Sequence, residues 1–148
     1  MHTIETTRFG RLEMEKSRII HFPNGLLGFP ANKDFVILEH KPNSPFCWLQ
    51  SVESPALAFV LTNPFLVQAD YLEGLSPTEK TIFGQGENGN QKVVFALVTI
   101  PRGEPEKVTV NLLGPLVIDI ATKTGSQVVL ADSGYSHRHP FTSQPEHA

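Results

Sequence analysis

Residues 108–130 constrain the fold of this chain more than any other stretch. Apolar and polar side chains alternate through residues 108–112, the period-two pattern of a strand with one buried face. Apolar, largely β-branched runs follow at 116–120 and 128–130, and a polar, glycine-containing segment at 122–126 predicts a tight connection between them. No helical period runs through this half of the sequence. The pattern predicts a core built from β-sheet.

Composition limits the class of protein. A chain of 148 residues fits one domain that can bury a core without covalent staples. Cys47 is the single cysteine, so an internal disulfide, and with it a disulfide-stapled secreted domain, is excluded. The first ten residues lack the apolar core of a signal peptide, and no apolar run reaches the roughly 18 residues of a membrane span. We expect a cytoplasmic protein that does not associate with membranes.

The net charge of −3 argues against direct binding of nucleic acid, which relies on a basic surface. The imbalance lies in the middle third, where residues 51–100 carry two basic and five acidic side chains. One interpretation is a solvated acidic face that keeps the protein soluble. The other is a docking surface for a basic protein.

The rest of the chain predicts many short strands and one helix. Residues 76–79 (SPTE) form a capping box with proline at the first helical position, and the helix should end near Phe83, before a run of glycines. Further strands are expected at 4–6, 9–14, 18–22, 35–38, 46–51, 57–61 and 93–98. About nine or ten short strands favour an all-β, mainly antiparallel barrel or sandwich over a βαβ fold, as a single domain over residues 1–141. Residues 142–148 are expected to be a disordered tail.

Two motifs that could carry chemistry are weak. Residues 84–89 match G-x-G-x-x-G, but they follow a helix and lead into a strand, whereas the dinucleotide fingerprint follows a strand and opens a helix. Asp132, His137 and His139 could be metal ligands, yet a zinc site needs three or four fixed ligands with a supporting shell. Nothing assembles an acid, a base and a nucleophile. We therefore expect no catalysis, no cofactor and no metal.

A series of short motifs runs through nearly the whole chain. The motifs are TRFG at 7–10, IHFPNGLLGF at 20–29, FVIL at 35–38, WLQS at 48–51, PALAF at 55–59, NPF at 63–65, DY at 70–71, VTIP at 98–101, NLLGPLVI at 111–118, QVVL at 127–130 and Tyr135. Together these segments resemble the flagellar assembly factor FliW family. They agree in order and spacing from about residue 3 to residue 141, and ten weak motifs in register make a specific match. Gly114 and Asp119 stand where alanine and asparagine are expected in relatives.

The resemblance implies a small, monomeric, barrel-like protein without catalysis. FliW-like proteins bind the translational repressor CsrA and antagonise it allosterically, without covering its RNA site. They also bind flagellin, so that free flagellin releases CsrA to silence flagellin mRNA. The alternative from a different class is a small-ligand-binding or metal-dependent hydrolytic β-barrel that uses Asp132, His137 and His139.

The sequence suggests two groups of partner-contacting residues. CsrA binds RNA and is therefore expected to be basic, and opposite potentials speed encounter. We therefore expect a group of acidic side chains to contact CsrA, with an exposed aromatic residue as the anchor of the interface. Alternatively, that aromatic residue belongs to the core. The second group is a loop too broken by glycine and proline to be regular. The acidic group is Glu53, Asp70 and Glu73 with Tyr71, and the loop group is Leu26, Leu27 and Phe29.

Overall fold

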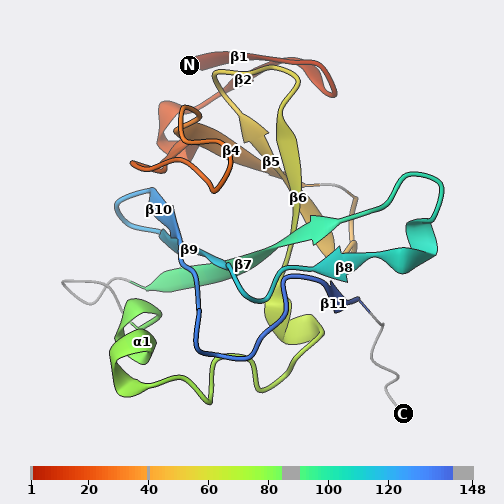
Figure 1. The fold of residues 1–148 in the computed structure, drawn as a ribbon. Coiled ribbons are helices and arrows are strands. Elements are labelled where there is room, and N and C mark those ends of the chain that lie inside the picture. Colours follow the sequence, from red (N-terminus) through yellow and green to blue (C-terminus); the bar gives the residue numbers. More distant parts are fainter. Residues whose placement is uncertain (1, 40, 85–90, 142–148) are drawn as a thin grey trace.

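The computed structural model describes residues 2–39, 41–84 and 91–141 (Figure 1). The predicted tail at 142–148 lies outside these residues, as does all of the glycine motif except Gly84.

Seven strands form a closed ring of hydrogen-bonded neighbours, in the order β7-β6-β5-β4-β3-β10-β9 and back to β7 (Figure 1). Every pairing in the ring is antiparallel except β3 with β10, which pair in parallel at His21 and Thr124. The mainly antiparallel, barrel-like prediction is confirmed. The ring strands are β3 (Ile20–His21), β4 (Asp34–Glu39), β5 (Phe46–Ser51), β6 (Ala58–Thr62), β7 (Lys92–Thr99), β9 (Leu116–Asp119) and β10 (Thr124–Gln127).

Strand β7 pairs with three strands, β6, β8 and β9. One edge pairs with β6, while the other pairs with β9 through its first half and with β8 (Thr109–Val110) through its second half. The short β11 (His139–Pro140) extends the sheet beyond β8. On one face of β7, Leu97 packs into the ring interior; on the other, Val98 packs against a second buried cluster. This explains why β7 is apolar at both parities.

The interior of the ring holds the first core cluster. Its centre is Phe22, Phe35, Leu49 and Leu61, all with no exposed surface. The second cluster covers the outer face of β7 and includes the segment between β6 and the helix. A separate hairpin of β1 (His2–Thr6) and β2 (Gly10–Met14) packs on β4 through a third, smaller cluster.

The predicted helix is α1 (Pro77–Ile82), and its cap is as expected. The Glu79 backbone N–H donates to the Ser76 hydroxyl at 3.2 Å, which satisfies one of the open donors at the helix start. Short 3-10 turns are η1 (Lys16–Arg18), η2 (Pro64–Leu66) and η4 (Pro105–Lys107). In the described part of the chain, no helix is long and apolar enough to cross a membrane.

The prediction of strands near residue 125 was wrong in its boundaries. Residues 128–130 were expected to be a strand and 122–126 a turn, whereas β10 is Thr124–Gln127. The turn comes earlier, where the Asp119 carboxylate accepts hydrogen bonds from the backbone N–H groups of Ala121 and Thr122. An asparagine at 119 could accept the same bonds through its side-chain oxygen, so the departure from the family pattern leaves this turn intact.

Gly125 was predicted to lie in a turn, but it lies in strand β10, where close packing requires glycine. A Cβ atom at this position would lie 2.6 Å from the ring of the buried Phe22. Glycine therefore lets β10 pass directly over the core phenylalanine. The strand expected at 108–112 is likewise confirmed only at its centre, as β8.

Candidate functional site

The three acidic side chains proposed as one surface lie at two ends of the molecule. Glu53 belongs to the connection between β5 and β6, at the top of Figure 1 beside β1 and β2. Asp70 and Glu73 belong to the segment between η2 and α1, at the bottom of the same view. All three are exposed, but they do not form a single face. We call Asp70 and Glu73 the acidic end.

The Glu53 side chain stabilises the start of strand β4. Its carboxylate accepts hydrogen bonds at 3.3 Å from the backbone N–H groups of Lys33 and Asp34, where β4 begins. A reversal of its charge would remove these bonds as well as an acidic group. Asp70 instead accepts a side-chain hydrogen bond from Gln68 at 2.6 Å, on the surface. Glu53 is therefore a poor position at which to test surface charge alone.

Tyr71 is a core residue, which corrects the expectation of an exposed anchor. Its side chain is 1% exposed, and its hydroxyl donates to the Leu112 carbonyl at 2.6 Å. The ring packs at 4.7 Å, centroid to centroid, from Tyr135. Burial, followed by the neighbouring Tyr135, raises the pKa of the Tyr71 hydroxyl. The sequence held a signal for this: Val67, Tyr71 and Leu75, all buried, recur every four residues.

The loop group divides between core and surface. Leu26 is 3% exposed and belongs to the ring interior, so its expected surface role is wrong. Leu27 is 63% exposed and Phe29 is 38% exposed. Leu26 and Phe29 exchange backbone hydrogen bonds at 2.7 and 3.3 Å, which closes a tight turn around Gly28, whose φ is +85°. We call residues 26–29 the Leu27 turn, because it holds that side chain toward solvent.

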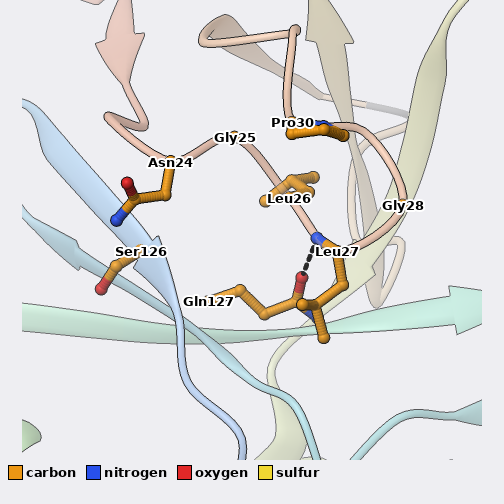
Figure 2. A pocket seen from close by; sticks show the side chains of 8 residues that line it. All are labelled: Asn24, Gly25, Leu26, Leu27, Gly28, Pro30, Ser126 and Gln127. Carbon is orange, nitrogen blue, oxygen red and sulfur yellow. Dashed lines mark hydrogen bonds between the residues drawn. The ribbon is translucent and has the colours of Figure 1, made fainter.

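A single glutamine fastens the Leu27 turn to strand β10. The Leu27 backbone N–H donates to Gln127 Oε1 at 2.9 Å (Figure 2). Gln127 Nε2 in turn donates to the Gly114 carbonyl at 2.9 Å. A Cβ at position 114 would lie 3.1 Å from that Nε2 atom, so glycine leaves room for the amide. The Phe29 ring meets Phe59 edge-on at 5.2 Å. These contacts join the turn to β10 and to Phe59 of β6, which restricts its freedom to change conformation.

A cavity of about 220 Å³ opens between the Leu27 turn and β10 (Figure 2). Loop residues 24–28 and 30 form one wall, and Ser126 and Gln127 form the other. An exposed leucine held rigidly beside a cavity suits an interface that buries apolar side chains at its centre. No sequence pattern could join these walls, because Leu27 and Gln127 lie 100 positions apart.

The alternative metal site is not assembled. His139 pairs with Val110 in the β11–β8 ladder, while Asp132 and His137 are exposed. Among the residues with described positions, no three His, Cys, Asp or Glu side chains are grouped so that they could hold a metal ion. Burial raises the pKa of the Cys47 thiol to about 11, which disfavours the thiolate that a nucleophile needs.

Comparison with known proteins identifies the family. The family model described as FliW protein matches residues 3–141. The flagellar assembly factor FliW of Geobacter sulfurreducens is 40% identical over 141 residues, covering 95% of this chain and 87% of that protein. Its counterpart from Magnetococcus marinus is 38% identical over 138 residues, covering 93% of this chain and 83% of the relative. A crystal structure of the flagellar assembly factor FliW superposes with a TM-score of 0.79 at 31% identity, covering 97% of this chain and 99% of that one. The chain belongs to the FliW family.

Proposed function

We propose that this protein binds CsrA and flagellin as alternative protein partners. When CsrA is bound, its affinity for flagellin mRNA falls, although the protein itself does not contact RNA. Free flagellin displaces CsrA and so restores repression. The observation that supports this proposal is the family match across residues 3–141. The protein acts as a monomer through binding rather than catalysis.

The acidic end is our proposed contact for CsrA. A protein that binds RNA carries a basic surface, and Asp70 and Glu73 offer it two exposed carboxylates. The Leu27 turn is the second proposed contact. Its rigid, exposed leucine would supply apolar burial, which slows dissociation more than it speeds encounter.

Surface plasmon resonance with immobilised CsrA separates these two contributions. Asp70→Lys/Glu73→Lys should slow association steeply, and added salt should slow the wild-type protein in the same way, since exposed charges are screened over about 8–10 Å. Leu27→Ser should leave association unchanged and speed dissociation. Glu13→Lys/Glu15→Lys is the matched control, because it reverses two exposed charges on another part of the surface. Equal effects of both double variants would exclude the acidic end.

The regulatory proposal has its own assay. In a gel shift, the protein should dissociate a preformed complex of CsrA with flagellin mRNA. A complex that survives excess protein would contradict the antagonism. Flagellin and CsrA should also exclude one another, because a switch needs negative coupling between its ligands. A stable ternary complex on size exclusion would refute that coupling.

A chelator tests the metal-dependent alternative. We expect CsrA binding and the circular dichroism spectrum to be unchanged after dialysis against a chelator. Loss of CsrA binding, or a spectrum that shows unfolding, would instead support Asp132, His137 and His139 as metal ligands.

A further inference from the structure

A second cavity, of about 530 Å³, lies against β7 and β8 and the residues that lead into β11. Its apolar part comes from Phe59 and Leu97, both half-buried side chains at the edge of the ring interior. Its charged part comes from Lys107 and Arg138, which are exposed, and the exposed His137 also lines it. None of the residues that line it is acidic. We call it the basic cavity.

The cations of the basic cavity are available to a ligand. Lys107 Nζ lies 3.3 Å from the Glu104 carboxylate, but both side chains are more than half exposed, so this ion pair is weak and exchangeable. The Arg138 backbone N–H donates to the Ser136 hydroxyl at 2.9 Å, which orders the backbone at this position. Over the described ranges, the Arg138 guanidinium forms no ion pair.

Two threonine hydroxyl groups also line the basic cavity. Thr99 of β7 and Thr109 of β8 are direct cross-strand partners, so their side chains lie on one face, and both line the cavity. Within the described part of the structure, neither hydroxyl is recorded in a hydrogen bond. A pair of hydroxyls can donate to and accept from the backbone of an extended peptide.

We propose that the basic cavity binds an acidic peptide segment in which carboxylate side chains flank a bulky apolar one. The apolar side chain packs on Phe59 and Leu97, and the carboxylates meet Lys107 and Arg138. Nucleic acid fits less well, because its affinity comes mainly from phosphate contacts with a broad basic surface, whereas this cavity offers two cations beside the apolar Phe59 and Leu97. The cavity shares no lining residue with the acidic end or the Leu27 turn, although Phe59 also packs against Phe29 of that turn.

Fluorescence anisotropy with labelled hexapeptides tests the proposal. The probe carries one phenylalanine flanked by glutamates. One comparison peptide has glutamine in place of each glutamate, and the other has alanine in place of phenylalanine. We expect the probe to bind and each comparison peptide to bind at least fivefold more weakly. No saturation by the probe at concentrations up to about 1 mM would overturn the proposal.

Variants locate the binding. Arg138→Ala and Lys107→Ala should each weaken the probe about twofold to fivefold, the range expected for exposed charge pairs. Lys16→Ala is the matched control, since it removes an exposed lysine on η1, far from β8 and β11 (Figure 1). Wild-type affinity in both cavity variants, or equal binding of the glutamate and glutamine peptides, would overturn the proposal.

Discussion

Replacement of Tyr71 by phenylalanine removes one buried hydroxyl while leaving the ring in place. That hydroxyl donates to the Leu112 carbonyl at 2.6 Å, and both residues have 1% or less of their surface exposed. The variant leaves a buried carbonyl without its hydrogen-bond donor, which costs about 1–3 kcal/mol. For a chain of this length the melting temperature should fall by about 2–12 °C.

Urea denaturation followed by the fluorescence of Trp48 measures this loss. The single tryptophan is half-buried, with the Phe9 ring at 5.7 Å and the Arg8 guanidinium at 4.4 Å, so unfolding changes its surroundings. Tyr135→Phe is the matched control. Its hydroxyl accepts from the Leu72 N–H at 2.8 Å but is only partly buried, so water can replace it and the loss should be smaller.

The same variant decides between a core tyrosine and an interface anchor. Because Tyr71 is buried, Tyr71→Phe should bind CsrA with the affinity of the wild-type protein. An unfolding free energy within about 0.5 kcal/mol of wild type, together with weaker CsrA binding, would refute the argument from burial.

Three further outcomes follow from the packing and the raised pKa values. Gly125→Ala should destabilise the protein by about 1–3 kcal/mol in urea denaturation, because its Cβ would meet Phe22 at 2.6 Å; Gly74→Ala, with no atom within 4 Å of its Cβ, should be near neutral and is the control. Cys47 should react with a disulfide reagent at pH 8 about 100-fold more slowly in the folded than in the unfolded protein, since its pKa rises from 9.0 to about 11; equal rates would contradict this. The folded state favours the neutral forms of Cys47 and Tyr71, so the unfolding free energy should hold below about pH 9 and fall as pH rises further; an increase in that range by denaturant titration would show the sign to be wrong.

Local patterns predicted those features that neighbouring residues create by themselves. The Ser76 cap depends on a backbone group three positions away, so its motif locates the start of α1. The continuous apolar, largely β-branched runs at residues 93–98 and 116–118 predicted β7 and β9, because a strand covered on both faces is apolar at every position. The family resemblance, carried by ten such segments in order, was confirmed over residues 3–141.

Tertiary structure decided what depends on distant neighbours. Glycine is typical of turns, but Gly125 lies in strand β10. Glycine is needed there because the ring of Phe22 fills the space that a Cβ atom would occupy. Tyr71 directly follows Asp70 and lies two positions before Glu73, but it is buried, and the carbonyl of Leu112, 41 positions later, accepts a hydrogen bond from its hydroxyl. Leu26 and Leu27 are identical in type, yet one is core and the other faces solvent.

The Leu27 turn shows the physical reason most clearly. Gly28 within the turn and Pro30 directly after it predicted an irregular loop, since these residue types set local backbone freedom. Its rigidity comes from the side chain of Gln127, which bridges Leu27 to Gly114 once β10 is in the ring. Hydrogen bonds between residues a few positions apart can be predicted from the sequence, because the local backbone conformation brings those residues together. Which strand edges meet depends on how the whole chain closes its ring, and that closure brings Gln127 to Leu27.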